Sequence, residues 1–215
     1  MLNIFLQNFK NKYNSPISNL FYGVSETKFK CHSCNTLNFD FQIYSVLDFP
    51  LQQVNKFYFD SGKRKLFNDD GTNPDINLYE CLEYYKKVNI MNGKNQIYCN
   101  RCHKLCDADH WTEIYSATNY LIINLNRGKG NIYDCKVIFP EQLNLFNYVA
   151  YKNGITVFEL YAVICKFGPS SWNGHFGAYC KNRIDNQWYL YDDDKITKSS
   201  EYQNGIPYIL FYRAD

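Results

Sequence analysis

The chain has 215 residues, of which 46% are hydrophobic and 18% aromatic, and its formal net charge is +2. A chain of this length can bury one sizeable hydrophobic core. The small net charge gives no basis for a nucleic-acid or acidic-membrane partner, and we expect neither a signal peptide nor a membrane-spanning segment.

The first half of the chain predicts two helices with strands and loops between them. Residues 1–13 predict a short helix, with apolar side chains on one face at Leu2, Phe5, Leu6 and Phe9. Residues 28–50 predict a hairpin around a pair of cysteines, and residues 51–74 predict a polar, loop-rich insertion. Residues 78–87 predict an amphipathic helix whose inward-facing residues are Leu78, Cys81, Leu82 and Tyr85.

The remaining segments are predicted to be mostly β-structure. Short runs rich in aromatic and β-branched residues alternate there with turn residues. The predicted strands are residues 96–98, 111–115, 120–124, 136–139, 156–166, 174–180, 188–191 and 209–212. The expected fold class is α+β with a predominance of β-structure.

Two Cys-x-x-Cys pairs indicate a zinc site. Each spacing lets a tight turn present two thiolates to one ion, and together Cys31, Cys34, Cys99 and Cys102 make a tetrahedral ligand set. The 64 residues between Cys34 and Cys99 mean that such a site joins distant strands. Four buried free cysteines are the alternative interpretation, and a variant of the zinc hypothesis replaces one ligand by His103 or Cys106. The other cysteines are interpreted as small core residues: Cys81, Cys135, Cys165 and Cys180.

The cysteine content also bears on the cellular compartment. Nine cysteines, four of them in metal-type pairs, favour a reducing environment over one that forms disulfides. The expected location is therefore intracellular, in the cytoplasm, the nucleus or both.

A histidine and a carboxylate flank a predicted hairpin near the C-terminus. If the turn is centred between Arg183 and Ile184, antiparallel pairing sets His175 directly opposite Asp192. A carboxylate in that position fixes the tautomer of the imidazole and stabilises the imidazolium, as in a catalytic triad. The alternative interpretation is a surface hairpin that carries a histidine and an acidic turn by chance.

These motifs, in this order, resemble the ubiquitin-specific protease family of cysteine deubiquitinases. The resemblance covers nearly the whole chain from about residue 14. The matching segments are residues 14–23 with 30–34, 39–50, 78–102, 120–140, 161–168, 174–176 and 188–193.

The resemblance implies a papain-like cysteine-protease palm at residues 120–215, which contains the histidine box. It implies zinc-ribbon fingers within residues 28–119, parts of which belong to the palm, and a thumb that is largely missing. His175 would act as general base and then general acid, and Asp192 would orient it, with Asp193 as the less favoured candidate. The loops around residues 126–130 and 167–173 would flank the channel for the ubiquitin tail, where the resemblance points to Gly128, Gly174 and Trp172. Arg127 and Lys129 are interpreted as solvated turn residues.

One departure from the family is severe. The family's nucleophile lies in an N-terminal box resembling Asn-x-Gly-Asn-Thr-Cys-Tyr, and this box does not occur in the 215 residues. Cys180 lies at an odd offset from His175 on one predicted strand and so faces the other side, while Cys135 and Cys165 lie in apolar strands.

Three functions stay open on the sequence alone. The first is a partial ubiquitin-specific protease domain that removes ubiquitin from proteins in the complete enzyme, with this chain a truncated gene model. The second is a catalytically inactive ubiquitin-binding or scaffold protein. The third is a zinc-ribbon nucleic-acid binder, which the low net charge and the lack of interleaved basic residues disfavour.

Overall fold

The computed structural model describes residues 15–129, 133–168, 174–200, 202 and 204–214. The helix predicted at residues 1–13 and the side chain of Trp172 lie outside these ranges. The chain divides into two compact units: residues 1–45, 85–118 and 145–156 form the first, and residues 46–84, 119–144 and 157–215 form the second. Among the described residues, no helix is both long enough and apolar enough to cross a membrane.

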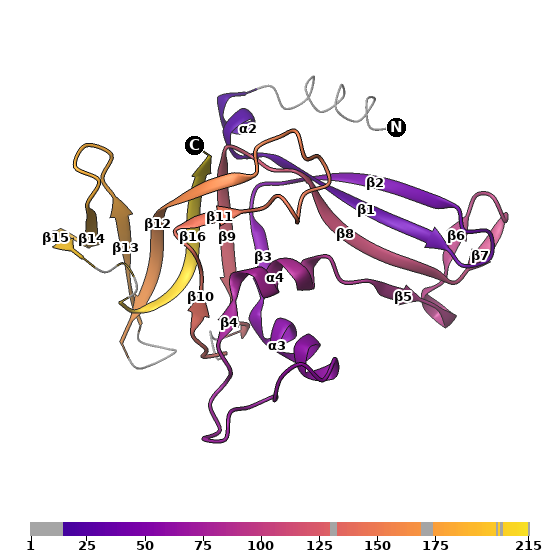
Figure 1. Ribbon diagram of the computed structural model, residues 1–215, viewed down its shortest axis with the longest axis horizontal. Coiled ribbons are helices and arrows are strands. Elements are labelled where there is room, and N and C mark those ends of the chain that lie inside the picture. The colour runs from indigo at the N-terminus through magenta and orange to yellow at the C-terminus, as the bar shows by residue number, and fades with distance from the viewer. Residues whose placement is uncertain (1–14, 130–132, 169–173, 201, 203, 215) are drawn as a thin grey trace. The chain divides into compact units, whose positions relative to one another are not determined.

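The first unit is built on a four-stranded antiparallel sheet with the order β2-β1-β8-β5 (Figure 1). The strands are β1 (Gly23–Cys31), β2 (Leu37–Tyr44), β5 (Asn89–Met91) and β8 (Ala108–Ser116). A separate ribbon pairs β6 (Ile97–Cys99) with β7 (Lys104–Cys106). The unit also contains the short helix α2 (Pro16–Phe21) and a 3-10 turn, η1 (Gly93–Asn95). The predicted hairpin around the first cysteine pair is therefore confirmed in β1 and β2.

Cross-strand contacts fix the register of β1 against β8. Thr27 and Thr112 are directly opposite each other, and their hydroxyl oxygens are 3.0 Å apart. Such pairs stabilise one register over its neighbours because a slip would separate them. The last pair of this ladder sets Cys31 opposite Ala108, which brings the first cysteine pair close to the segment that follows the second.

The second unit contains an eight-stranded sheet in which seven strands follow the order β15-β14-β13-β12-β16-β9-β3 and β11 also pairs with β12. The strands are β3 (Leu47–Pro50), β9 (Tyr120–Asn126), β11 (Gln142–Asn144), β12 (Val157–Phe167), β13 (His175–Lys181), β14 (Trp188–Asp192), β15 (Lys195–Ser199) and β16 (Ile206–Ala214). Only the β3–β9 pair in this sheet is parallel. A further parallel pair joins β4 (Ile76–Asn77) to β10 (Val137–Ile138). The prediction of a mostly β fold is confirmed.

The prediction of a loop-rich insertion at residues 51–74 is wrong in its first part, which forms helix α3 (Leu51–Asp60). Leu51, Val54 and Tyr58 recur at helical spacing and are buried together with Asn55. The outward face is polar, and the helix follows Pro50 without a side-chain cap, so the usual start signal is missing. Without a start signal, and with polar residues between its apolar positions, this short amphipathic segment resembles a polar loop in the sequence.

The second predicted helix is confirmed as α4 (Leu78–Tyr85). Its start is fixed by a reciprocal cap, because the Tyr79 N–H donates to Asn77 Oδ1 at 2.9 Å and the Asn77 N–H donates to Glu80 Oε2 at 2.8 Å. The buried residues are Leu78, Cys81, Leu82 and Tyr84. Tyr84 thus replaces the predicted Tyr85 among the most buried side chains.

Candidate metal and histidine sites

The two Cys-x-x-Cys turns have the same backbone conformation. Each ends in a residue with left-handed φ, 56° at Asn35 and 54° at His103. In each turn this residue donates its backbone N–H to the carbonyl of the first cysteine at 2.8 Å. The left-handed residue closes the turn tightly, so both thiols of a pair project to the same side.

The four thiols of these turns converge on one point. Cys31 Sγ lies 4.0 Å from Cys102 Sγ, and Cys34 Sγ lies 3.6 Å from Cys99 Sγ. All four sulfur atoms lie within 4.8 Å of one another. Tetrahedral Zn–S bonds of about 2.3 Å require sulfur atoms about 3.8 Å apart, whereas a disulfide would require about 2.05 Å. The donor set therefore fits a single tetrahedral metal ion and not a pair of disulfides.

The surroundings of the thiols favour at least one thiolate. The Thr36 hydroxyl and backbone N–H lower the pKa of the Cys34 thiol to about 6. Hydrogen bonding with Cys34 and burial raise the pKa of the Cys102 thiol, so it keeps its proton while its neighbour is ionised. Four thiolates repel one another at this spacing, and a bound cation removes that repulsion.

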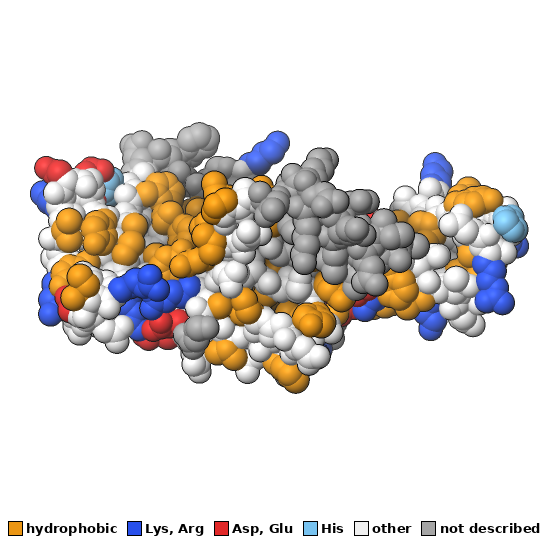
Figure 2. All heavy atoms as spheres, turned by 90° about the horizontal axis from the view of Figure 1, so that it is seen from above, with side chains coloured by type: hydrophobic (Ala, Val, Ile, Leu, Met, Phe, Trp, Pro, Cys, Tyr) orange, Lys and Arg blue, Asp and Glu red, His pale blue; other side chains and the backbone are white. Residues whose placement is uncertain are grey.

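His103 and Cys106 do not belong to this group of four. The His103 side chain is exposed. Figure 2 shows lysine, arginine and histidine side chains among hydrophobic ones on the surface of the end of the unit that carries β6 and β7. Cys106 is buried beside the cluster, with its Sγ 3.6 Å from the Lys104 carbonyl oxygen. Among the described residues, Cys31, Cys34, Cys99 and Cys102 thus provide a complete set of four ligands, and neither His103 nor Cys106 needs to take the place of one of them.

The second site joins the start of β13 to the end of β14. The His175 ring is hydrogen-bonded through Nε2 to Asp192 Oδ1, and both side chains are partly exposed, at 46% and 41%. The hydrogen bond and the charge of Asp192 raise the pKa of His175 above its usual value. Because Asp192 already binds Nε2, the other ring nitrogen, Nδ1, is available for proton transfer.

The predicted register of this hairpin is wrong by two residues. The observed pairs run from Lys181–Trp188 to Ala178–Tyr191, so the turn is centred between Ile184 and Asp185. Asn182 accepts a hydrogen bond from the Ile184 N–H at 2.8 Å through its side chain, and Asn186 takes a left-handed φ of 56°. These two asparagines place a four-residue loop at residues 183–186, with its centre one residue further along the chain than predicted.

An even shift preserves the face of each side chain. His175 and Asp192 therefore still project to the same side of the sheet, but they meet diagonally and not directly across the ladder. A shift of one residue would have placed them on opposite faces.

A second carboxylate lies beside the pair. The ligand atoms of His175, Asp192 and Asp193 all lie within 4.8 Å of one another. Asp193 has a left-handed φ of 51°, and its charge also raises the pKa of His175, after the contributions of Asp192. Both predicted acidic residues thus act electrostatically on the same ring.

Gly128 and Gly174, two of the three residues assigned to a tail channel, lie in the described part of the chain. Gly128 has a φ of 80°, and its N–H donates to Asn126 Oδ1 at 3.0 Å. A Cβ at Gly174 would lie 1.7 Å from Cε of the buried Lys166 side chain. The position of Gly128 thus favours glycine for its backbone conformation, whereas a side chain at Gly174 would have to displace the Lys166 side chain.

Arg127 is not a solvated turn residue. It is only 2% exposed and donates to the carbonyl oxygens of Tyr133, Cys135 and Pro207 at 3.1, 3.0 and 3.1 Å. Its guanidinium also lies 5.3 Å from the centre of the Tyr208 ring. Lys129, in contrast, is exposed.

The burial of Arg127 continues an alternation that is present in the sequence. Leu121, Ile123 and Leu125 are buried at every second position of β9, and residue 127 is the next in that series. The charge of Arg127 predicts an exposed side chain, whereas its place in the two-residue period of β9 predicts a buried one.

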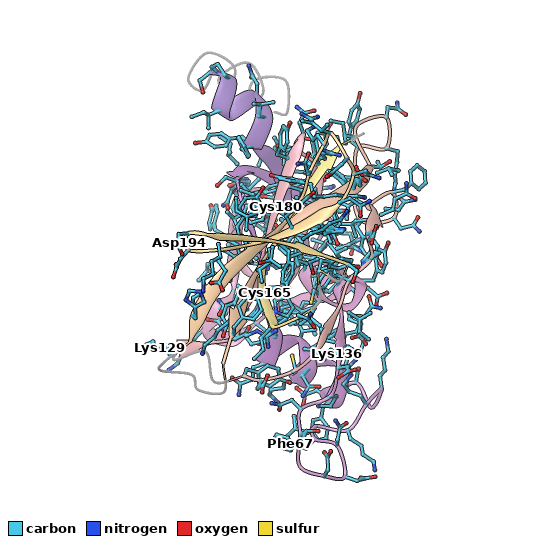
Figure 3. All side chains as sticks on the ribbon, turned by 90° about the vertical axis from the view of Figure 1, so that its left-hand side faces the viewer. Phe67, Lys129, Lys136, Cys165, Cys180 and Asp194 are labelled. Carbon is cyan, nitrogen blue, oxygen red and sulfur yellow. The ribbon has the colours of Figure 1, made fainter. Side chains whose placement is uncertain are left out.

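The thiols outside the cluster have poor nucleophilic character. Burial raises the pKa of Cys135 to about 11 and that of Cys165 to about 12, and it also raises the pKa of Cys180. Figure 3 shows Cys165 and Cys180 within the strands of the second unit, while Asp194 lies at the turn between β14 and β15. A reactive cysteine requires an exposed site that lowers its pKa, so these three do not meet the requirement.

Comparison with known proteins identifies the family. The family model "Ubiquitin carboxyl-terminal hydrolase" matches residues 2–212. A relative from Saccharomyces cerevisiae, "Ubiquitin carboxyl-terminal hydrolase 12", is 31% identical over 159 residues, which are 69% of this chain. The match covers only 12% of that relative.

Two solved structures have a similar fold. A yeast SAGA DUB module with an Sgf73 mutant matches with a TM-score of 0.72 at 22% identity, over 99% of this chain and 45% of the matched one. A SAGA module of Ubp8, Sgf11, Sus1 and Sgf73 matches with a TM-score of 0.73 at 22% identity, over 97% and 44%. This chain thus spans less than half of either matched chain. By the family model that covers nearly all of its length, the chain belongs to the ubiquitin carboxyl-terminal hydrolase family.

Proposed function

We propose that this chain recognises ubiquitin and that, in the complete enzyme, it takes part in hydrolysing the bond after the last glycine of ubiquitin. The observation that carries the proposal is the His175–Asp192 contact in a chain of this family. An accessible imidazole held by a carboxylate is the base and orienting group of a thiol hydrolase.

His175 moves the proton in this mechanism. The imidazole takes the proton of a cysteine thiol, and the thiolate attacks the carbonyl carbon of ubiquitin's last glycine to give a tetrahedral intermediate. The imidazolium gives its proton to the amine as the C–N bond breaks, which leaves a thioester. Water, deprotonated by His175, then attacks the thioester, and the C–S bond breaks to release the ubiquitin carboxylate and the thiol, which regains the proton from His175. Asp192 fixes the ring and stabilises the imidazolium, and Asp193 adds negative charge nearby.

The cysteine in this scheme is proposed to come from outside these 215 residues. Four of the nine cysteines form the metal-type cluster, and burial raises the pKa of Cys135, Cys165 and Cys180. A segment of a longer polypeptide or a separate polypeptide would supply the thiolate together with the thumb on which it lies.

We further propose that Cys31, Cys34, Cys99 and Cys102 hold a structural Zn²⁺. The support is the donor chemistry and the Sγ separations of 3.6 and 4.0 Å in two turns of matching conformation. When bound, the ion supplies no chemistry to the reaction and ties two segments of the first unit together. The free state of all nine cysteines supports a reducing, intracellular location.

The proposed partners are ubiquitin and ubiquitinated proteins. A tail that ends in two glycines is selected by a channel in which backbone approaches backbone closely. Gly128 and Gly174 are the channel residues that support this assignment, and Trp172 is the third candidate.

The test uses the full-length protein and ubiquitin with a fluorogenic C-terminal amide. We expect His175→Ala to lower kcat by at least about 10²–10⁴-fold, the usual contribution of an acid–base residue, while ubiquitin binding persists. His110→Ala, which removes a histidine from β8, is the matched control and should keep its activity. Full activity of His175→Ala would refute the mechanism. Binding of ubiquitin without turnover in the unmodified protein would instead establish the inactive ubiquitin-binding function.

A further inference from the structure

The two carboxylates beside His175 have no basic side chain to balance their charge. Asp192 is hydrogen-bonded to the His175 ring, and neither Asp192 nor Asp193 forms an ion pair with a lysine or arginine in the described part of the chain. All three side chains are exposed or partly exposed. Two negative charges thus face one imidazole at the surface of the second unit.

A tight turn brings both carboxylates to the same ring. The β14–β15 ladder ends at the pair Asp192–Lys195. The two residues between them, Asp193 and Asp194, therefore form the turn, and Figure 3 labels Asp194 there. On a regular strand the side chains of neighbouring residues point to opposite faces of the sheet. Asp193 departs from that pattern with a φ of 51°, and its carboxylate lies within 4.8 Å of the donor atoms of His175 and Asp192.

These residues form a mixed set of one nitrogen and two oxygen donors. Imidazole and carboxylate groups are ligands of Zn²⁺ and related divalent transition ions, and three protein ligands leave coordination positions for water. Donor atoms bound to one ion at about 2.1 Å lie about 3.0–3.4 Å apart, so small rotations of the three side chains bring them onto an ion. His32, in contrast, pairs with Asp109 at 2.8 Å but belongs to no group of three donors among the described residues.

We propose that His175, Asp192 and Asp193 bind a divalent transition-metal ion, with Zn²⁺ as the probe, and that this ion inhibits the hydrolysis. The inhibitory part rests on the proposed function. The ion takes the place of the proton between Nε2 of His175 and Asp192, and that proton passes to water. Mg²⁺ and Ca²⁺ do not fit the site, because they prefer oxygen ligands and one of the three donors is a nitrogen.

A metal ion on Nε2 also disables Nδ1, the nitrogen that exchanges protons in the proposed mechanism. A neutral imidazole has one nitrogen with a free lone pair and one that carries a proton. When the ion takes the lone pair of Nε2, Nδ1 keeps its proton and cannot accept another. His175 then cannot take the proton of a thiol. The ion and the proton therefore compete for one ring, and no oxidation or reduction is involved.

The test of binding uses the 215-residue chain, loaded with zinc at its cysteine cluster, and needs no ubiquitin. A further titration with zinc chloride is followed by calorimetry and by the NMR resonances of the histidine rings. We expect one more equivalent of Zn²⁺ to bind and to shift the His175 resonances, and Mg²⁺ to do neither. The absence of a further equivalent, or shifts confined to His32, His103 or His110, would overturn the proposal.

Two neighbouring substitutions separate coordination from general charge attraction. Asp193→Asn should weaken the second binding step at least about tenfold, because a neutral amide replaces a carboxylate ligand. Asparagine also tolerates a left-handed φ, so the turn is kept. Asp194→Asn removes the same charge from the next residue, which lies outside the group, and should weaken binding less than about threefold. Equal losses in the two variants would contradict a site built on Asp193.

Inhibition is tested separately on the full-length protein with the fluorogenic ubiquitin substrate. Zn²⁺ should lower the rate over the range in which it binds, and dilution into metal-free buffer should restore the rate. Asp193→Asn should need at least about tenfold more Zn²⁺ for half inhibition, measured against its own rate without added metal. Inhibition that Asp193→Asn leaves unchanged would place the ion on another group and refute the inhibitory role. Binding to the 215-residue chain without any hydrolysis by the full-length protein would contradict the proposed function alone.

Discussion

His175 and Asp192 are hydrogen-bonded diagonally across a hairpin whose ladder sets Tyr191 opposite Ala178. The contact therefore depends on the four-residue loop at residues 183–186 as well as on the two side chains. It makes the protonation of His175 a direct report on the arrangement of the site.

The pKa of His175 should lie above about 6.5 in an NMR titration of the chain. Asp192→Asn should return the pKa toward about 6.5, because it removes both the charge and the charge-assisted hydrogen bond that raise it. Asp193→Asn is the matched control and should lower the pKa less, since Asp193 acts only through its charge. The reverse order of the two effects would exclude Asp192 as the principal partner.

The same contact should make stability depend on pH with a definite sign. The pKa of His175 is higher in the folded than in the unfolded state. The contact therefore adds its full contribution to the stability of the folded state at pH values below the pKa of the unfolded chain, about 6.5. The contribution is lost as the pH rises through the folded value. The Tm difference between the natural chain and Asp192→Asn should thus be larger at pH 5 than at pH 9, and a difference that grows with pH would contradict this assignment.

Metal analysis of the purified chain should find about one zinc ion per molecule. Cys99→Ser should lose the ion and lower Tm by at least about 5 °C, because structural zinc contributes on the order of 10 kcal/mol in small peptides and a few kcal/mol shift Tm measurably. Cys106→Ser is the control, since Cys106 is equally buried beside the cluster but is not one of its four ligands. Loss of zinc from Cys106→Ser together with its retention in Cys99→Ser would reassign the site.

Arg127→Met should destabilise the second unit by about 2–4 kcal/mol in denaturant unfolding. The substitution leaves buried carbonyl groups at Tyr133, Cys135 and Pro207 without their donor. Lys129→Met, at an exposed position two residues away, should stay within about 0.5 kcal/mol of the natural chain. Equal effects of the two substitutions would show that the buried contacts add little stability.

The 215-residue chain by itself should not react with a thiol-directed ubiquitin probe. The cysteines that lie outside the cluster and within the β-rich second unit keep their protons at neutral pH because burial raises their pKa. The full-length protein should react, and His175→Ala should abolish that reaction. If the 215-residue chain is labelled and Cys180→Ser prevents the labelling, the Cys180 thiol serves as the nucleophile.

Local sequence patterns predicted the strands and the cysteine turns well. The two-residue alternation of β9 and the paired Cys-x-x-Cys spacings each need only a few neighbouring residues, and the structure follows both. β15 has no such pattern, because four of its five residues are exposed and none forms an apolar alternation. Its existence depends on pairing with β14, which the local sequence does not encode.

The errors have separate physical causes. The hairpin register depended on the side-chain hydrogen bond of Asn182 and the left-handed Asn186, and either residue is also compatible with a shorter turn. At Arg127 the charge predicts exposure and the two-residue period of β9 predicts burial, and the period is the better guide because carbonyl oxygens satisfy the buried guanidinium. Asn55 lies in a polar segment of the sequence, and only the tertiary packing of α3 buries it.

The spacing of the two cysteine turns also constrains the order of folding. Closing a chain segment of 64 residues at random costs about 3.7 kcal/mol in chain entropy beyond a constant term, so early assembly of the four thiols is unfavourable. Once β1 has paired with β8, little of this cost remains for the thiols, because the pair Cys31–Ala108 leaves only five residues between Cys102 and a residue already in register. We therefore expect the ladder to form before the thiols meet. On that order a newly made chain first carries two separate dithiols, each open to oxidation, and the proposed zinc site would depend on their staying reduced until the ladder has formed.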